Sequence, residues 1–288
     1  MARYQVVQTT TYAYSPPARR TITQCRLKPA DDHHQRLLSF RMKIEPTAHV
    51  HEHVDYFGNH AATFDIWTPH ATLTIRTESL LEVHRGPYDA VRHVLDRDPS
   101  NPADERARWA EYLAPTDYTR AAPDVLEKLS RDAWHTSATD YDYAWAIARQ
   151  IYRRFRYVPG DTTVETTAEE FIAQGRGVCQ DFAHLMIALL RCRGIPARYI
   201  SGYIDCGQDA ALRGDAATHA WVEALMPGRV WVGFDPTNNT WTNNQYVRLA
   251  MGRDYRDIAP TRGVYVGGRQ ELTVRVSMQR VTQNAAVQ

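Results

Sequence analysis

The first part of the chain alternates apolar and polar residues with the period of two that is typical of β-strands. Runs rich in Thr, aromatic and branched residues cover 4–12, 37–44 and 71–77, and segments with Pro, Gly, Asp and Asn separate them. Repeated short strands with such turn signals favour a small antiparallel sandwich. The segment Phe57-Gly58-Asn59-His60, which lies between two of the runs, predicts a hairpin turn.

From about Gly86-Pro87 the apolar residues recur every three or four positions, which is typical of helices. Asn101-Pro102 and the acidic residues after it predict the start of a helix that continues through 108–113. A second helix is expected over 140–155, and Thr167-Ala168-Glu169-Glu170 predicts a capping box that opens a short third one. This region therefore differs in kind from the first.

The stretch from Gly177 to Tyr203 joins an apolar helix that starts at Cys179 to a predicted strand. Further strand patterns follow at 219–226, 230–235 and 264–281. Because the helices precede the strands and do not alternate with them, we expect an α+β fold with the cysteine helix packed on an antiparallel sheet.

The length of 288 residues suits two domains. We place them at residues 1–90, a β-sandwich, and 91–288, the α+β unit, with the boundary near 86–100. The 34 basic and 33 acidic side chains give a net charge of +1, so nothing in the charge balance favours nucleic acid or an anionic membrane surface.

No apolar run approaches the ~20 residues that a membrane span needs, and the N-terminus lacks a signal-peptide pattern. We therefore expect a cytoplasmic protein. Its four cysteines, Cys25, Cys179, Cys192 and Cys206, are too few and too unevenly placed for a disulfide framework, so they are expected to be thiols.

Cys179 has the position that activates a thiol. A free cysteine has a pKa of about 8.5, and a helix N-terminus or a nearby imidazolium lowers it. Gly177 allows the loop before the helix to approach closely and expose the sulfur. Two further motifs supply the groups that such a nucleophile needs.

Strand alternation in THAWVEA places His219, Trp221 and Glu223 on one face. The motif GFDPTN ends a neighbouring strand at Asp235, just before a proline. Asp235 can therefore fix the imidazole of His219, and His219 can act as base toward Cys179. A small buried thiol, a sheet histidine and a turn-capping aspartate are the alternative interpretations of the same residues.

The blocks GVCQDFAHL, THAWVEA and GFDPTN resemble the three signature motifs of the bacterial transglutaminase-like superfamily, whose core is similar to that of papain-like cysteine proteases. The β-rich first third and residues 252–260 resemble its two-domain members. The resemblance implies that Cys179 is the nucleophile, His219 the general base and acid, and Asp235 the orienting carboxylate.

The family's oxyanion hole would use the backbone N–H of Cys179 as its first donor. Gln174, Gln180 and Tyr157 are alternatives for the second. Candidates for lining an apolar substrate cleft are Trp221 and Trp241, with Trp231, Tyr203 and Tyr246, and core packing is the alternative for each. Asp181, three residues into the helix, is expected to cap its first turn.

A zinc site made of Cys179, His184, His219 and Asp235 is disfavoured, because positions 179 and 184 are five apart on the helix and point to different faces. We expect neither a metal nor a cofactor.

The expected activity is cysteine-dependent acyl transfer on amide or isopeptide bonds of a peptide or protein, through a thioester. Hydrolysis by a peptidase or amidase is favoured. A crosslinking transglutaminase, a non-catalytic binding or scaffold protein that keeps the fold, and an arylamine acetyltransferase-type enzyme are the alternatives. No partner nucleic acid or membrane is expected.

Overall fold

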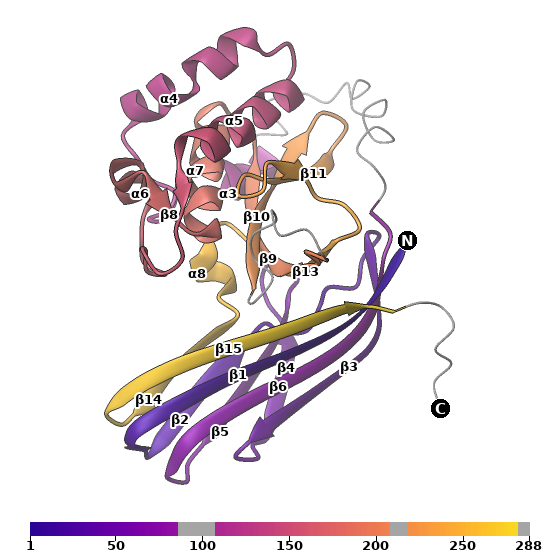
Figure 1. The fold of residues 1–288 in the computed structure, drawn as a ribbon, viewed down its shortest axis with the longest axis vertical. Helices are drawn as coiled ribbons and strands as arrows, with labels where there is room; N and C mark the ends of the chain where they lie inside the picture. The colour runs from indigo at the N-terminus through magenta and orange to yellow at the C-terminus, as the bar shows by residue number, and fades with distance from the viewer. Residues whose placement is uncertain (86–106, 208–217, 282–288) are drawn as a thin grey trace.

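The computed structural model describes residues 1–85, 107–207 and 218–281. Figure 1 shows a strand-rich part, which contains both ends of the described chain, and an α+β core beside it. The expected domain boundary near 86–100 and the expected helix start at Asn101-Pro102 lie outside the described residues.

The strand-rich part contains two four-stranded antiparallel sheets. One has the order β15 (Arg269–Arg280), β1 (Ala2–Ala18), β6 (His70–Val83), β3 (Gln35–Glu45), and the other β14 (Thr261–Val266), β2 (Arg20–Cys25), β5 (His60–Ile66), β4 (Val50–Val54). Inward-facing residues such as Leu73, Ile75 and Phe64 form its buried cluster. The predicted antiparallel β-sandwich is confirmed.

The hairpin predicted at Phe57–His60 joins β4 to β5. Gly58 has a φ of 84°, which a residue with a side chain rarely adopts, and Val54 pairs with His60 across the turn. This local prediction is therefore confirmed as well.

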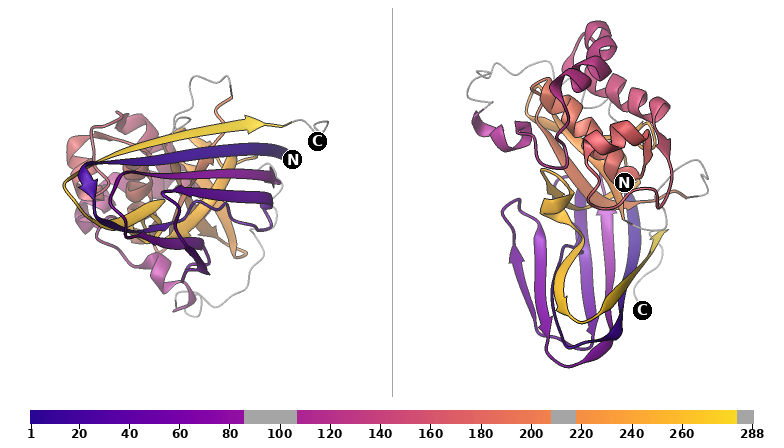
Figure 2. Two further views of the ribbon diagram at one scale, coloured as in Figure 1. Left: turned by 90° about the horizontal axis from the view of Figure 1, so that it is seen from below. Right: turned by 90° about the vertical axis from the view of Figure 1, so that its left-hand side faces the viewer.

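The strands β14 and β15, from the far end of the sequence, complete the two sheets of the first part. β14 pairs with β2, and β15 pairs with β1 along most of its length. Figure 2 shows the two strands diverging from their shared turn, each toward its own sheet. The division at residue 90 stays a prediction, and the structure adds that 261–280 pair with strands that precede it.

The α+β core is built on a five-stranded antiparallel sheet. Its order is β12 (Thr240–Trp241), β11 (Val230–Asp235), β10 (His219–Met226), β9 (Ala197–Ile204), β13 (Tyr246–Gly252). The two short strands β7 (Arg156–Tyr157) and β8 (Arg176–Gly177) form a separate parallel pair.

Helices cover the core sheet, and their bounds are α3 (Ala110–Leu113), α4 (Pro123–Thr136), α5 (Asp140–Arg154), α6 (Ala168–Gln174), α7 (Cys179–Cys192) and α8 (Tyr255–Ile258). The predicted capping box of Thr167 and Glu170 is present at α6. α4 is not among the predicted elements, although Pro123 in its first turn is a helix-start signal. Within the described residues no helix is long and apolar enough to cross a membrane.

α7 is the central helix of the core. It packs on β9 and β10 with one side and against α4, α5 and α6 with the others, so every residue from Gln180 to Arg191 is buried. A helix that is covered on all sides is mostly apolar around its circumference, and the buried polar residues of α7, such as Asp181, His184 and Arg191, are hydrogen-bonded. The expected packing of the cysteine helix on an antiparallel sheet is confirmed.

Candidate active site

Cys179 is the first residue of α7, and Asp181 holds the helix start in place. The backbone N–H of Val178 donates to Asp181 Oδ2 at 2.7 Å, and Thr162 Oγ1 donates to the same oxygen at 2.6 Å. A side chain at Gly177 would overlap both Asp181 and Phe171. The predicted capping role of Asp181 is therefore confirmed, and only glycine fits at position 177.

His219 and Asp235 meet across two neighbouring strands. His219 begins β10 and Asp235 ends β11, and the antiparallel pairing of these strands brings His219 Nε2 to 2.7 Å from Asp235 Oδ2. Both side chains are fully buried. The two neighbouring strands thus bring His219 and Asp235 into contact, as the order of the motifs predicted.

The electrostatics of His219 depend on Asp235 and Cys179. Burial by itself would lower the pKa of His219, but the Asp235 carboxylate and the Cys179 thiol outweigh it and raise the pKa to about 10. Asp235 engages Nε2, and a side-chain hydrogen bond to Cys179 contributes to the rise as well. Both neighbours therefore favour the protonated imidazole.

Asp235 accepts several further hydrogen bonds. Oδ2 accepts from Asn238 Nδ2 at 2.7 Å and from Tyr246 Oη at 2.8 Å, and Oδ1 accepts from the backbone N–H of Thr237 at 2.9 Å. Burial alone would raise the pKa of Asp235, but the charge of His219 and these donors keep it below its usual range.

The sequence offered Tyr246 only as a candidate cleft residue and gave Asn238 no role, yet both donate to Asp235. Asn238 follows Asp235 by three positions, the spacing at which the two side chains of a turn meet, so a signal existed. Tyr246 lies on β13, two strands away from β10 in the sheet, and no local pattern placed it beside Asp235. Only the folded sheet brings its hydroxyl to the carboxylate.

The aromatic residues proposed for a substrate cleft pack against other side chains. Tyr203 and Tyr246 are buried, and Trp231 is half-buried against Trp109 and Tyr112. Trp221 is fully buried and contacts Tyr246 edge to face, with ring centroids 5.3 Å apart. Its role as a cleft residue is corrected, because the face of β10 that carries it is covered. Trp241 is half-buried and stacks on Trp145 at 4.1 Å and on Tyr141 at 4.7 Å.

The three candidates for a second oxyanion donor lie in different settings. Gln174 is exposed at the end of α6, and Tyr157 is half-buried with its ring 6.3 Å from that of Phe182. The amide of Gln180 donates to the carbonyl oxygen of Val164 at 2.9 Å. Gln180 is thus engaged with the loop beside the helix start, and the choice among the three stays a prediction.

His184, a member of the disfavoured zinc site, is held away from the other three residues. Its Nε2 accepts from the backbone N–H of Tyr255 at 3.2 Å, and its ring lies between Tyr118 and Tyr199 at 5.3 and 5.1 Å. In the part of the chain that the structure describes, no three His, Cys, Asp or Glu side chains are arranged to hold a metal ion.

Two family models match this chain, one in each of its two parts. Residues 4–82 match the bacterial transglutaminase-like N-terminal region, and residues 127–236 match the transglutaminase-like superfamily. The second match covers Cys179, His219 and Asp235.

Two relatives extend these matches. An uncharacterised protein of Mycobacterium leprae is 34% identical over 284 residues, which cover 98% of this chain and 100% of that one. A protein-glutamine gamma-glutamyltransferase of Pseudomonas aeruginosa is 28% identical over 145 residues, which cover 46% of this chain and 20% of that protein.

The fold recurs in a solved structure. A candidate cysteine protease from Cytophaga hutchinsonii superposes with a TM-score of 0.79 at 24% identity, over 99% of this chain and 92% of that one. At this identity the likeness establishes the arrangement of both parts of the molecule and leaves the chemistry to the site residues.

Proposed function

The chain belongs to the transglutaminase-like superfamily, and from that membership we propose that it is a cysteine-dependent enzyme that transfers acyl groups from amide or isopeptide bonds. One observation carries the proposal: the buried hydrogen bond of 2.7 Å between His219 and Asp235, with Cys179 close enough to raise the pKa of the histidine. Cys179 is assigned as nucleophile, His219 as general acid and base, and Asp235 as the group that orients the imidazole.

In the acylation step the Cys179 thiolate attacks the carbonyl carbon of the amide. The C–N bond then breaks, the leaving amine takes a proton from the His219 imidazolium, and a thioester remains on Cys179. The positive end of the α7 dipole and the charged imidazole both favour the thiolate from which the reaction starts.

In the deacylation step water attacks the thioester carbonyl while His219 takes one of its protons. The C–S bond breaks, the carboxylic acid leaves, and the thiolate and imidazolium are restored. We propose this hydrolytic outcome as the main one, which makes the protein a peptidase or amidase.

Capture of the thioester by an amine instead of water is the second candidate outcome and would crosslink proteins. It is favoured by the likeness of 46% of this chain to a protein-glutamine gamma-glutamyltransferase. The same residues carry both outcomes, so the acceptor alone distinguishes them.

The chain contains its own control for the reactivity of Cys179, because Cys192 lies exposed at the other end of the same helix. With iodoacetamide at pH 6, we expect Cys179 to be alkylated at least ten times faster than Cys192, since thiolate is the reactive form. Peptide mapping by mass spectrometry measures both rates. His219→Ala should reduce the rate at Cys179 and leave that at Cys192 unchanged.

Peptide mixtures incubated with wild type and with Cys179→Ala then test turnover. We expect hydrolysis products, with deamidation or crosslinks as the sign of the other outcome, in the wild-type sample only. Equal alkylation rates of Cys179 and Cys192, together with identical product spectra for the two proteins, would contradict the proposed activity. They would indicate a non-catalytic protein with this fold.

A further inference from the structure

The strands β14 and β15 border an open slot in the strand-rich part of the molecule. β14 is the outer strand of one sheet and β15 is the outer strand of the other, and Gly267-Gly268 connects them. Each strand pairs on one side only within the described residues. Two unpaired backbone edges therefore lie on the same side of the sandwich, where the turn holds them together (Figure 2).

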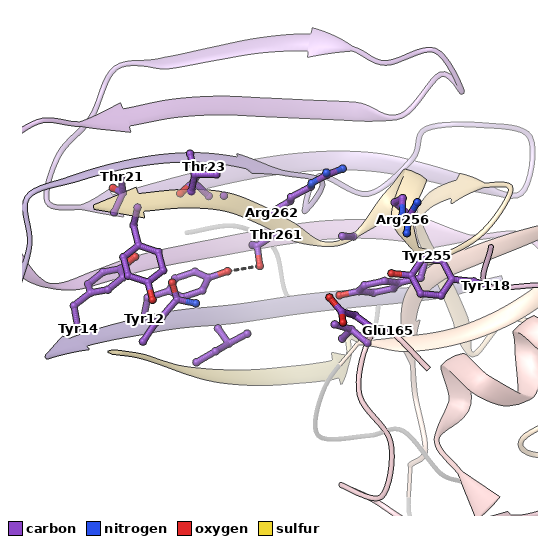
Figure 3. Close-up of a pocket in the computed structure, with 17 residues that line it drawn as sticks. Tyr12, Tyr14, Thr21, Thr23, Tyr118, Glu165, Tyr255, Arg256, Thr261 and Arg262 are labelled. Carbon is purple, nitrogen blue, oxygen red and sulfur yellow. Dashed lines mark hydrogen bonds between the residues drawn. The ribbon is translucent and has the colours of Figure 1, made fainter. Parts of the chain in front are cut away.

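A cavity of about 810 Å³ occupies this slot, within the ~300–1,000 Å³ that is usual for ligand sites. Figure 3 shows Tyr12 and Tyr14 at one end and Tyr118, Tyr255 and Glu165 at the other. The cavity thus runs from the interior of the sandwich to the α+β core.

The backbone of β14 faces this cavity with groups that are free to pair. The N–H of Arg26 donates to the carbonyl of Pro260 at 2.9 Å. In the antiparallel pairing of β2 and β14, this bond fixes which residues of β14 direct their backbone N–H and C=O groups toward β2. Arg262 and Val264 then direct their backbone groups toward β2, and Gly263 and Tyr265 direct theirs into the slot. All residues from Thr261 to Tyr265 line the cavity, and the six residues of β14 span about 20 Å.

The side chains at this edge are also suited to contact with another chain. Val264 is 69% exposed and Leu272, on β15, is 49% exposed, although both are apolar and both line the cavity. Natural sheets usually protect an outer strand with charged residues or proline, because an apolar edge pairs with other chains. β14 carries the charged Arg262, but Val264 and Val266 leave much of its exposed face apolar, so this edge is only partly protected and can accept another strand.

The inner end of the slot lies at the loop that contacts the first turn of α7. Val164 and Glu165 border the cavity there, and the carbonyl of Val164 accepts the hydrogen bond of Gln180, the residue after Cys179. The same loop holds Asp181 through Thr162. A chain that lies along β14 therefore reaches the loop that contacts the helix start.

We propose that the slot binds an extended segment of the polypeptide substrate, which adds to β14 as a further strand. The backbone of that segment pairs with Gly263 and Tyr265, and its side chains contact Val264, Leu272 and the tyrosines of the cavity. The proposal rests on the proposed function in one respect: the bound segment belongs to the acyl donor.

The test uses the full chain with Cys179→Ala and fluorescein-labelled β-casein, an unfolded protein, as the probe. Fluorescence anisotropy should show saturable binding, and Val264→Arg should weaken it at least tenfold. Val54→Arg is the matched control, because Val54 is 62% exposed on β4, the opposite outer strand of the same sheet, and does not line the cavity. Equal loss of binding in the two variants would overturn the proposal.

Hydrogen exchange on the Cys179→Ala protein tests the same point without a change in the slot. Bound casein should slow exchange at Gly263 and Tyr265, whose N–H groups face the cavity, and leave β4 unchanged. Protection confined to other strands would contradict the proposal. So would a dimer in light scattering that Val264→Arg dissociates, since a second copy would then occupy the edge.

The alkylation assay separates this inference from the proposed function. Fast labelling of Cys179 in a protein that does not bind casein would contradict the proposed binding site and support the proposed enzymatic activity. The opposite result is casein binding that depends on Val264, together with a Cys179 that reacts as slowly as Cys192. It would contradict the proposed enzymatic activity and support a polypeptide-binding site.

Discussion

At the scale of single residues, Asp235 determines the state of the site. A carboxylate at zero exposure needs its charge balanced and its oxygens satisfied, and here an imidazolium, an amide, a phenol and backbone N–H groups do both. Tyr246 donates its hydrogen bond to Asp235 over the whole working pH range. Its phenol stays protonated because burial and Asp235 raise its pKa well above the usual value.

Tyr246→Phe should shift the pH dependence of the enzyme. Without the phenol, the field of Asp235 acts more strongly on His219, so the pKa of His219 rises and the basic limb of kcat/KM moves to higher pH. A hydrogen bond to a charged group contributes about 1.5–3 kcal/mol, so stability should fall by a similar amount. A pH–rate profile and urea unfolding measure the two effects.

Tyr203→Phe is the control for a buried phenol that does not touch the site. Tyr203 Oη donates to Gln8 Oε1 at 2.7 Å, so its loss also removes a buried hydrogen bond. This variant should be less stable with an unchanged basic limb. If the profiles of both variants move equally, or neither moves, Tyr246 has only a structural part in the fold.

At the scale of elements, α7 illustrates the cost of burying a helix that carries polar side chains. His184 sits in the middle of this helix at zero exposure. Burial, with a smaller contribution from Arg191, lowers the pKa of His184 to about 3, so the folded protein keeps the ring neutral. In the unfolded chain the same ring takes up a proton near pH 6.5.

His184 should therefore make stability depend on pH. The unfolded state binds the extra proton between about pH 6.5 and 3, so stability is full above that window and falls with pH by about 1.4 kcal/mol per pH unit. His184→Gln keeps an acceptor for Tyr255 and cannot titrate, so its free energy of unfolding should fall less between pH 7 and 5. Urea unfolding at the two pH values measures the slopes.

His135→Gln, on the exposed surface of α4, supplies the comparison for that slope. It should keep the wild-type dependence on pH. A slope for His184→Gln as steep as that of wild type would mean that other groups, such as His34, cause the whole effect.

At the scale of the whole molecule, a buried ion network joins the two parts of the chain. Glu223 of β10 pairs with Arg198 at 2.6 Å, with Arg85 at 3.4 Å and with Arg248 at 3.6 Å, and Arg248 also pairs with Asp32. Arg85 and Asp32 come from the strand-rich part and the others from the core. A single carboxylate thus balances cations from both sides of the interface.

Glu223→Gln should strongly destabilise the protein, by about 3–5 kcal/mol, because it leaves buried guanidinium groups uncompensated. Burial alone would raise the pKa of Glu223, but the three arginines outweigh it and hold the pKa far below the usual range. The contribution is therefore present above about pH 4.5 and lost as pH falls below it.

Glu78→Gln is the control for this effect, because it removes an ion pair, that of Glu78 and Arg76, which is exposed. Its loss should cost about 0–1 kcal/mol in the same urea unfolding experiment at pH 7. A similar small cost for Glu223→Gln would show that the interface does not depend on the network.

What the sequence determined by itself is mostly local. The alternation at 4–12 and 71–77, the Thr167 capping box and the glycine before Cys179 predict their elements because the causes lie within a few residues. The pairing of His219 with Asp235 was also within reach, since they lie in two strands that follow one another and can pair as a hairpin.

Only the tertiary structure decided which distant segments meet. The single strand run predicted at 264–281 is divided by Gly267-Gly268 into β14 and β15, and the pattern does not specify their partners β2 and β1, which lie at the other end of the chain. The burial of Trp221 and the hydroxyl of Tyr246 at Asp235 likewise depend on neighbours that no short window contains. The physical reason is that period and capping act between adjacent residues, whereas strand partners are selected by the packing of the whole sheet.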